Sequence, residues 1–571
     1  MSTPTATPRA TPLPALPFGA FGWSLAGVIG ISLSAPPTGF YPLAWIGLVP
    51  LLVRWSEHRS AAVCAREVYA LVLTLAASTG FWLLFDSSVS RAALGGLGML
   101  VLPLPLVAAV TLAGVVRRRF GLVVGLAALV LTILATEYAL LLAPRSVPWL
   151  LLGHTQVEAL PFIQTADLGG VLLLSFWVLM LNVTAFAALP FAAGKGQWGS
   201  WLGDSGVAVA LFAVLIAGPA VYGAARTVWS ETPVGYARVG LVQPGVAPDE
   251  WTASGPARVD VLAELSDRLL GRWTAADSAK ATRDGTPLSN LVADGRRRTP
   301  RSLSAAPQRG GAGAGTETGA GAVGLLIWPQ GSLPNMGTSE REAETLDRLG
   351  RWCAERNVAL ITGATTIAPG DDRDSREDDA EVTSAFLLGP TAAVTRYDQM
   401  RHVPVADAPS VPGLQRTLLP VGGVHVGALL GFESLFGDHA RRFAQEGADL
   451  FVVLPQSDRW GRSGGIEQHL QATRLRAIET RRAVIVASVG GVSALVHPSG
   501  QIDAATGWME QGLIPLDVPT YRSETVYTRH GDWVGQWAAG GALMLYLIAG
   551  VVFYLRPDAP KRRVRPQAAR V

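Results

Sequence analysis

The chain has 571 residues, of which 49% are hydrophobic and only 16% are charged, and its formal net charge is +3. The mean hydropathy of +0.31 is too high for a wholly soluble protein, and no basic stripe crosses the less apolar middle, which argues against nucleic-acid binding. The apolar residues are concentrated in roughly the first 225 positions and the last 40. This composition predicts a membrane protein that carries one globular domain.

Eight apolar stretches are candidates for membrane spans, since a helix needs about 20 residues to cross the hydrocarbon core. The second stretch is short and could instead be re-entrant. The first has no clear basic start and no small-residue cleavage site, so we expect a retained anchor and not a cleaved signal peptide. The predicted spans are Phe18–Ser34, Tyr41–Val53, Val68–Phe85, Leu94–Val116, Leu122–Leu142, Val171–Ala192, Val207–Ala225 and Val534–Leu555.

Lysine and arginine in the short loops predict the orientation, because they accumulate on the cytoplasmic side. One side holds only Arg91, Arg145 and Arg226 in its short loops. We therefore expect residues 227–531 to lie outside the cytoplasm, whether or not the second stretch crosses. The predicted domains are a bundle of about seven spans (1–226), the soluble domain (227–531), and a last span with a basic cytoplasmic tail (532–571). The side predicted to be cytoplasmic holds the larger set: Arg54, Arg59, Arg66, Arg117, Arg118, Arg119, Lys195, Arg556, Lys561, Arg562, Arg563, Arg565 and Arg570.

The soluble part alternates short strand-like runs with helical segments, which indicates a layered α/β domain. Residues 275–324 are rich in Gly, Ala, Thr and Ser and are predicted to be a disordered insertion. Asp371–Glu381 reads as a second polar loop without the spacing of a calcium site. The predicted helices are Ala257–Trp273, Glu340–Arg356, Asp438–Glu446 and Glu467–Thr480. The predicted strands are Val239–Val242, Gly324–Ile327, Ala359–Gly363, Ser384–Leu388, Ala393–Tyr397, His425–Leu430, Leu450–Leu454, Val484–Ala487 and Ser493–His497.

Four motifs lie at ends of these strands: WPQGSLP, YDQMRHVPVAD, LLGFESLF, and the segment from Gln468 to Leu495. Three more are PWLLLGHTQ (Pro148–Gln156), SFWVLMLN (Ser175–Asn182) and VGLVQPG (Val239–Gly245). With these motifs the chain resembles the apolipoprotein N-acyltransferase family, the membrane-embedded members of the nitrilase (carbon–nitrogen hydrolase) superfamily. The resemblance spans nearly the whole chain, in the same order.

The resemblance implies a polytopic helical membrane bundle of about eight spans and an extracytoplasmic, nitrilase-like αββα sandwich. Active relatives carry a Glu–Lys–Cys triad. The cysteine takes an acyl chain from a phospholipid as a thioester and passes it to the amino terminus of a lipoprotein. Such chemistry needs a base, a cation for the developing oxyanion and a soft nucleophile.

The chain departs from the family pattern at all three triad positions. The base position holds Gln330, the cation position holds Gln399, and the nucleophile position holds Gly431. A neutral amide has no useful basicity, and glycine has no side chain. Loss of one triad member already costs several orders of magnitude in rate, so we expect no competent catalytic residue here. The remaining candidates for pocket or binding residues are Trp328, Asp407, Phe432, Glu433 and Ser434.

A relocated nucleophile is the alternative to inactivity. Cys353 reads as a half-buried helix cysteine, and Cys64 lies at the wrong end of a span. Ser434 could pair with one of three nearby histidines, although no orienting acid or oxyanion pocket is visible in the sequence. Separately, Glu137 is an intramembrane carboxylate, which is either functional or an interfacial residue. The three histidines considered as partners of Ser434 are His402, His425 and His439.

The sequence therefore predicts a non-catalytic homologue of apolipoprotein N-acyltransferase in the bacterial plasma membrane. It would bind membrane phospholipid or a lipoprotein N-terminus, or assist another envelope enzyme. One alternative is an active N-acyltransferase with a relocated nucleophile. Another is a membrane scaffold for a polyprenol-phosphate glycosyltransferase. No cofactor, metal or nucleic acid is expected.

Overall fold

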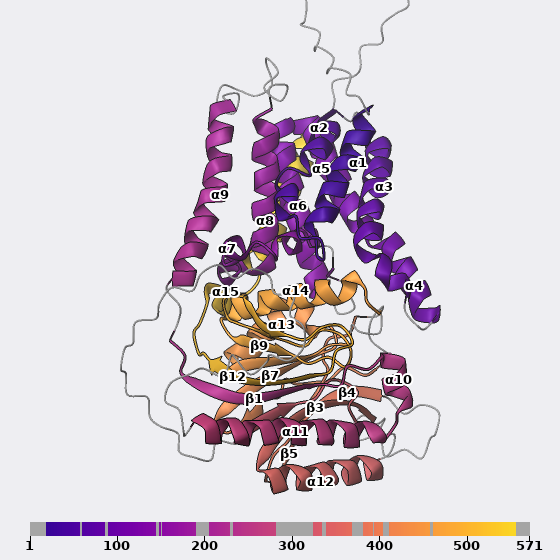
Figure 1. Ribbon diagram of the computed structural model, residues 1–571. Coiled ribbons are helices and arrows are strands. Elements are labelled where there is room, and N and C mark those ends of the chain that lie inside the picture. The colour runs from indigo at the N-terminus through magenta and orange to yellow at the C-terminus, as the bar shows by residue number, and fades with distance from the viewer. Residues whose placement is uncertain are drawn as a thin grey trace, which may run out of the picture.

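The computed structural model has a helical bundle at one end and a layered α/β domain at the other (Figure 1). It describes residues 19–57, 60–85, 89–143, 148–149, 151–189, 205–228, 232–280, 324–333, 339–367, 381–391, 393–403, 410–456 and 461–555. The bundle comprises α1 (Gly19–Ser34), η1 (Tyr41–Trp45), α2 (Val49–Glu57), α3 (Ala61–Gly80), η2 (Phe81–Phe85), α4 (Val89–Val101), α5 (Pro103–Phe120), α6 (Leu122–Leu142), η3 (Leu152–Gln156), α7 (Leu160–Ile163), α8 (Ala166–Ala187), α9 (Ser205–Val228) and, from the other end of the chain, α16 (Trp533–Leu555).

Six helical segments within the described residues are long and apolar enough to cross a membrane, where the sequence predicted about eight spans. The first predicted span forms α1, which has 16 residues and falls short of that length. The predicted Leu94–Val116 span is broken between α4 and α5, next to Pro103. The six segments are Ala61–Phe85, Val89–Phe120, Leu122–Leu142, Ala166–Ala187, Gly206–Val228 and Trp533–Leu555.

The predicted span Tyr41–Val53 is not one helix. It divides into the five-residue 3₁₀ helix η1 and the nine-residue α2, with Gly47 between them. A Cβ added to Gly47 would lie 2.8 Å from the Ile31 side chain, so glycine lets this segment pack closely on α1. Because α2 would extend only about 13 Å, it cannot cross a bilayer core.

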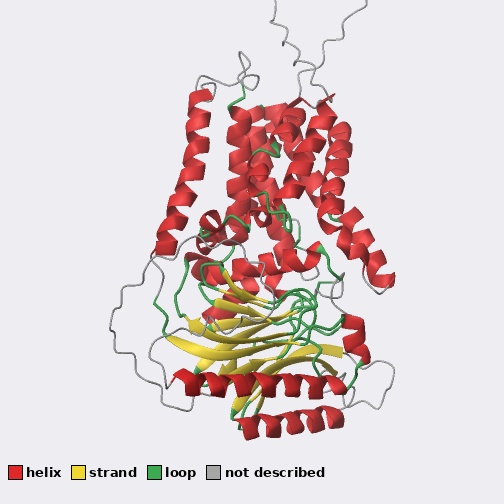
Figure 2. Ribbon diagram, in the orientation of Figure 1, coloured by secondary structure: helices red, strands yellow, loops and turns green. Residues whose placement is uncertain are grey.

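Two six-stranded sheets face each other in the α/β domain, with orders β12-β1-β2-β3-β4-β5 and β11-β10-β9-β8-β7-β6 (Figure 2). Each sheet has parallel pairs at its centre and antiparallel pairs toward its edges. The strands are β1 (Gly235–Gln243), β2 (Gly324–Ile327), β3 (Val358–Ile367), β4 (Glu381–Leu388), β5 (Val394–Asp398), β6 (Leu419–Val421), β7 (Val424–Leu430), β8 (Leu450–Leu454), β9 (Ala483–Val486), β10 (Ala494–Val496), β11 (Ile502–Ala505) and β12 (Gly512–Thr520).

Helices cover the outer face of each sheet and complete an αββα sandwich. The main core lies between the sheets, and a second core lies between the first sheet and its two long helices. Residues 275–280, predicted to belong to the insertion, continue α11, and Gly324 begins β2; residues 281–323 lie outside the described residues. The covering helices are α11 (Ala257–Lys280) and α12 (Ser339–Arg356) on one side, and α13 (Gly437–Gln445) and α14 (Gly464–Thr480) on the other; α10 (Pro248–Ala253) and α15 (Val526–His530) are short.

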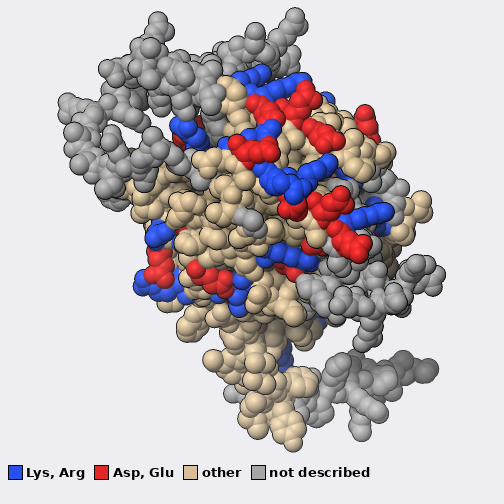
Figure 3. Space-filling model, turned by 90° about the horizontal axis from the view of Figure 1, so that it is seen from below, with Lys and Arg blue, Asp and Glu red and all other residues tan. Residues whose placement is uncertain are grey.

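The face of the α/β domain opposite the bundle carries interspersed charges of both signs (Figure 3). The helices α11 and α12 lie on this side (Figure 1). The ion pair Arg356–Asp267 joins the two helices, and the pair Arg268–Glu264 lies on the surface of α11. Such exposed pairs contribute little stability each, but mixed charge keeps the surface hydrated. This face therefore suits contact with solvent.

Helix α14 joins the α/β domain to the bundle. Fourteen of its residues are buried, polar ones among them, so its hydrogen bonds must be made to protein on both sides. Arg474 donates to the carbonyl oxygen of Val157 at 3.1 Å, and Arg481 donates to the Asp167 carboxylate of α8 at 2.5 Å and 3.1 Å. These contacts fix the α/β domain against the bundle and place the ends of β5 and β7 near the junction.

Candidate functional site

Gln330 is positioned by the turn that follows β2. The Trp328 backbone N–H donates to the Ile361 carbonyl at 2.9 Å, and its indole N–H donates to Ser266 at 2.9 Å, so Trp328 is a core residue that fixes the turn. Gln330 is 6% exposed, and its Nε2 lies 3.5 Å from the Ala364 carbonyl oxygen. Its Oε1 has no hydrogen-bond partner among the described residues.

Close packing against β3 accommodates the Gln330 amide. A Cβ added to Gly363 would lie only 2.0 Å from Gln330 Oε1. Glycine at position 363 is therefore needed for a side chain of this length to point along the strand edge. The turn and the glycine together present the end of residue 330 next to β3.

Gln399 follows β5 and is completely buried. Its backbone N–H donates to the Thr383 carbonyl of β4 at 2.8 Å, and its Nε2 donates to the Arg401 carbonyl at 2.9 Å. Within the described part of the chain, its Oε1 has no partner. The site thus contains a second buried amide whose oxygen is left unpaired.

Gly431 directly follows β7 and has a left-handed backbone, with a φ of +54°. Its N–H donates to the Leu454 carbonyl at 3.0 Å, which holds the sharp turn against β8. Any L residue would be strained in this conformation, whereas glycine adopts it freely. At the position where the resemblance places a nucleophile, the chain therefore has neither a reactive side chain nor a strained backbone.

The sheet register brings Gln330 and Gln399 to the same edge of the first sheet. Gln330 contacts Ala364, and Gln399 contacts Thr383; Ala364 pairs with Ser384, the next residue along β4 from Thr383. Because neighbouring strands lie about 4.8 Å apart, the two residues lie beside one short stretch of β3 and β4.

Glu433 ties this edge to the turn at Gly431. The fully buried carboxylate accepts hydrogen bonds from the N–H groups of Met400 at 2.7 Å, Arg401 at 3.1 Å and Leu430 at 2.9 Å. It also accepts from the Tyr397 hydroxyl at 2.8 Å and 2.9 Å. One side chain therefore fixes the segment after Gln399 to the residue before Gly431.

The Glu433 carboxyl is held in its ionised form. Burial alone would raise its pKa, but the nearby His439, at 3.4 Å, and the backbone donors outweigh burial and lower that pKa below its ordinary value. A carboxylate saturated in this way is a structural anchor. It is a poor general base, because every donor around it favours the charged form.

Ser434 pairs with a histidine that the sequence did not indicate. Its Oγ lies 2.8 Å from His469 Nε2 of α14 and accepts a hydrogen bond from Thr473 Oγ1 at 2.9 Å. Burial lowers the pKa of His469 to about 3, so the ring is neutral near pH 7. The contact depends on how α14 packs against η5 (Glu433–Leu435), which no local pattern reveals.

The three histidines predicted as partners of Ser434 contact other groups. His439 lies 3.0 Å from the Tyr397 hydroxyl, and His425 faces Asp449 at 3.5 Å. His402 lies 2.6 Å from the Ser410 hydroxyl. None of these three contacts involves Ser434, whose histidine neighbour is His469.

The other candidates separate into core residues and contacts at the junction. Phe432 stacks on the His469 ring at 4.7 Å and contacts Trp149 of the bundle side at 5.6 Å. Cys353 is fully buried in the core beneath α12, and burial raises its thiol pKa to about 12, so it is not an activated nucleophile. Asp407 lies outside the described residues.

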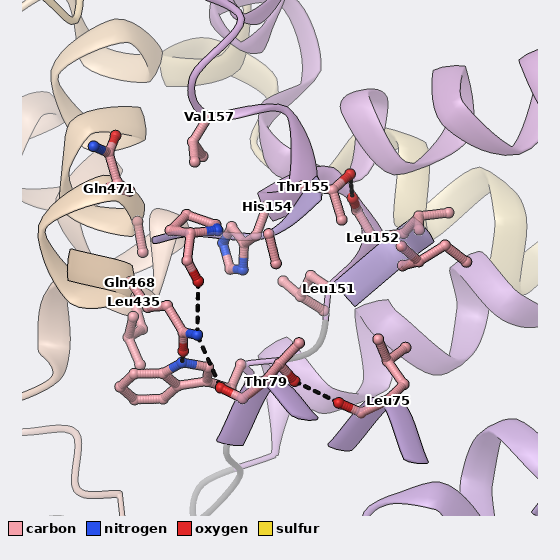
Figure 4. Close-up of a pocket in the computed structure, with 15 residues that line it drawn as sticks. Leu75, Thr79, Leu151, Leu152, His154, Thr155, Val157, Leu435, Gln468 and Gln471 are labelled. Carbon is pink, nitrogen blue, oxygen red and sulfur yellow. Dashed lines mark hydrogen bonds between the residues drawn. The ribbon is translucent and has the colours of Figure 1, made fainter. Parts of the chain in front are cut away.

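A pocket opens between the bundle and α14, beside this site (Figure 4). Leu435 and Ala472, neighbours of Ser434 and Thr473, form part of its wall. Gln468, at the wall of the pocket, donates to the carbonyl oxygens of Thr79 at 2.8 Å and Pro36 at 2.9 Å and so links α14 to the bundle (Figure 4). The remaining wall is largely apolar and comes mainly from α1, α3 and η3.

Comparison with known proteins identifies both halves of the chain. Residues 26–184 match the model of the apolipoprotein N-acyltransferase N-terminal domain, and residues 313–526 match that of the carbon-nitrogen hydrolase family. A solved amidase of the nitrilase superfamily from Nesterenkonia AN1 aligns with 53% of the chain and 97% of its own length, at 18% identity and a TM-score of 0.34.

Relatives align with the chain over nearly its whole length. An apolipoprotein N-acyltransferase from Chlorobaculum tepidum is 27% identical over 92% of this chain and 95% of its own length. One from Geobacter metallireducens is 28% identical over 92% of this chain and 94% of its own length. With both domain models matched in the same order, the chain belongs to the apolipoprotein N-acyltransferase family of membrane-embedded, nitrilase-like proteins.

Proposed function

We propose that this chain is a non-catalytic member of the lipoprotein N-acylation family, which binds membrane lipid or lipoprotein without transferring an acyl group. The observation that carries the proposal is the turn at Gly431, where a left-handed glycine occupies the expected nucleophile position. Relatives named apolipoprotein N-acyltransferase support the ligand class, since that name describes transfer to a lipoprotein.

The chemistry of the other two positions supports the same conclusion. The amides of Gln330 and Gln399 carry no charge, and the Oε1 atom of each is buried without a partner in the described structure. A neutral amide neither removes a proton nor stabilises an oxyanion as a cation does. A thioester cannot form where there is no sulfur, so binding is the function left to this site.

The proposal includes an orientation and domain limits. Arg54 and Arg117 lie near the C-terminal end of α8, where Trp55 and Phe186 share a cluster, whereas the N-terminal end of α8 contacts α14. The part of α8 after its kink at Gly169 and Gly170, Val171 to Ala187, would span about 25 Å, so these basic residues lie at the end away from the α/β domain. The positive-inside rule then supports an extracytoplasmic domain over residues 227–531, between the bundle of 1–226 and the final helix.

An acyl-transfer assay tests the proposal directly. Purified protein in detergent is given a phospholipid donor and a diacylated lipopeptide acceptor, and the product is measured by mass spectrometry. We expect no triacylated product above the protein-free background. The assay is repeated with the variant Gln330→Glu, Gln399→Lys, Gly431→Cys, for which we expect an acyl adduct on the new cysteine.

The matched control carries Gln330→Glu and Gln399→Lys but keeps Gly431, so it lacks the nucleophile alone. We expect no adduct on this control. Product formed by the unaltered chain at a rate that rises with its concentration would refute the non-catalytic proposal.

A second candidate function, serine-based acyl transfer, is favoured by the contact between Ser434 and His469. Ser434 Oγ would attack the ester carbonyl of a phospholipid and pass its proton to His469 Nε2. A lysophospholipid would leave after its oxygen takes that proton from His469. An amine would then attack the serine ester and lose a proton to His469, which returns it to Ser434 Oγ as the ester bond breaks. A histidine whose pKa is about 3 is a weak base, and Ser434 is fully buried, which is why this function stands second.

Substitution of Ser434 separates the two candidates. Under the first, Ser434→Ala leaves lipid binding unchanged and no adduct is seen in either protein. Under the second, the unaltered chain carries a hydroxylamine-sensitive acyl ester that Ser434→Ala abolishes. Thr473→Val is the matched control, since it removes the neighbouring hydroxyl and leaves the serine.

A further inference from the structure

A second cavity lies inside the membrane bundle, farther from the α/β domain than the pocket at α14. It measures about 1040 Å³ including its open side, and residues of α1, α2, α3, α5, α6 and α8 form most of its wall. The wall of this chamber is mostly leucine and valine. The pocket at α14 and this chamber share Ile31, Leu75 and Leu152 in their walls, so the two spaces adjoin at these three side chains.

Most polar groups at the chamber wall are already paired. Arg54 and Glu67 form a 2.8 Å ion pair. Asn182 accepts from the Leu48 N–H at 2.8 Å and donates to the Ala44 carbonyl at 2.7 Å. Glu137 is the exception, because its Oε1 accepts from the Leu152 N–H at 2.8 Å but its Oε2 has no hydrogen-bond partner in the described structure. The rest of the wall is apolar, so an occupant that is mostly hydrocarbon suits it best.

Helix α3 gives the length of the combined space. Glu67 lines the chamber, and Thr79, twelve residues later on α3, lines the pocket at α14. Twelve residues of α-helix extend about 18 Å. Since a bilayer core of about 30 Å contains two layers of acyl chains, one extended chain occupies about half of it, roughly 15 Å. The space therefore has the length of a single lipid chain.

The pocket at α14, at the end of the combined space opposite Glu67, adds one unpartnered polar group. His154 is buried and lines the pocket, and its Nε2 has no hydrogen-bond partner in the described structure (Figure 4). Burial lowers the pKa of His154 to about 3 and leaves its ring neutral, while a hydrogen bond to the Trp149 backbone uses the other nitrogen. An unprotonated Nε2 accepts a hydrogen bond, so the ligand group that fits it carries an O–H or N–H.

We propose that the bundle binds one chain of a single-tailed amphiphile, with the hydrocarbon in the chamber and a hydrogen-bond-donating head on His154. The ligand class rests on the proposed lipid-binding function and deepens it, because it assigns the tail and the head to separate residues. The site concerns binding only. A failure of lipid binding in the bundle would therefore be distinguishable from acyl transfer at Gly431, which the assay above measures.

A ligand series on the unaltered protein tests the tail. Saturated 1-monoacylglycerols of 8 to 18 carbons compete with a tritiated 16-carbon monoacylglycerol on protein held in amphipol. We expect affinity to rise about fourfold for each added methylene and then to level off once the chain fills the space. A series with no plateau, or with no dependence on length, would overturn the proposal.

Two substitutions locate the tail. Val183→Trp fills the chamber from α8, and we expect the plateau to move to a chain several carbons shorter. Val115→Trp adds the same ring on α5 at a side chain that is 46% exposed, and we expect no change. An equal shift in both variants would mean that the lipid binds the outer surface, which contradicts the proposal.

A matched ligand pair tests the head. We expect 1-monopalmitoylglycerol to bind about tenfold more tightly than methyl palmitate, which has the same chain but no donor, as one hydrogen bond in a buried site allows. His154→Phe keeps a flat ring of similar size, so it should abolish this preference while the length dependence remains. If the preference survives in His154→Phe, the head does not bind there and the proposal fails.

Discussion

Substitution of Glu433 by alanine is expected to destabilise the protein by about 4 kcal/mol, since removing one member of a buried charged network leaves its partners unpaired. The carboxylate accepts hydrogen bonds from Tyr397 and three backbone N–H groups, and it has no exposed surface. For a domain of this size the loss corresponds to a fall on the order of 10 °C in the melting midpoint. Thermal unfolding in detergent, followed by tryptophan fluorescence, measures it.

A second carboxylate provides the control for this change. Glu446 accepts from Arg416 at 2.7 Å, but its side chain is 40% exposed, so we expect Glu446→Ala to cost less than about 1 kcal/mol. Equal melting midpoints for the two variants would show that Glu433 does not hold the ends of β5 and β7 together.

The stabilisation by Glu433 has a definite pH dependence. Because its pKa is lower in the folded protein than in the unfolded chain, its contribution is complete above the unfolded value of about 4.3. The contribution is lost as the pH falls through the lower, folded value. The difference in melting midpoint between the native protein and Glu433→Gln should therefore be constant from pH 8 to 5 and shrink below pH 4.

Replacement of Asp167 by asparagine is the change expected to weaken the junction most. Its carboxylate, 3% exposed, accepts from Arg481 and Arg226 and from the Tyr222 hydroxyl at 2.7 Å. Asparagine leaves two guanidinium groups without their countercharge, one of them nearly buried, at an expected cost of about 3 kcal/mol. Thermal unfolding in detergent is again the measurement.

Two further variants make this prediction specific. Glu158→Gln alters a peripheral pair with Arg474 at 3.5 Å, in which the glutamate is 37% exposed, and should change the midpoint little. The double change Asp167→Asn with Arg481→Met should recover part of the loss, because it also removes the uncompensated charge. If the double variant melts below Asp167→Asn, the cost does not come from the unpaired arginine.

The sequence predicted most strands of the sandwich because their residues are buried on both faces. Leu450–Leu454 and Gly324–Ile327 were placed at the bounds that the structure gives. The prediction missed β12, which contains Pro515 and Pro519. Proline breaks a central strand, but β12 is an edge strand of its sheet, where a missing N–H is tolerated.

The predictions for the membrane part depended on hydropathy, which does not report how a segment packs. Tyr41–Val53 is as apolar as a span, yet Pro42 opens a 3₁₀ turn and Gly47 permits close contact with α1. Hydropathy measures only the tendency to leave water. It does not distinguish a short buried segment from one that crosses a bilayer.

The candidate site was predictable only where motif and strand end coincide. Gln330, Gln399 and Gly431 each follow a predicted strand. The register of β3 and β4 explains why Gln330 and Gln399 lie near one stretch of the first sheet, and Glu433 links the segment after Gln399 to the turn at Gly431. His469 was missed because its contact with Ser434 joins a helix to a turn 35 positions earlier in the chain. Contacts of this kind depend on tertiary packing and leave no periodic signal in the sequence.

The burial of α14 also restricts the order in which the protein can be assembled. Its partners α8 and η3 precede it by about 300 residues, whereas α15 and α16 follow it. During synthesis, most of the bundle is therefore made before this helix emerges, and the last helix only afterwards. The α/β domain cannot satisfy the polar groups of α14 alone, so its folding is completed on a bundle that already exists, and α16 closes the structure last.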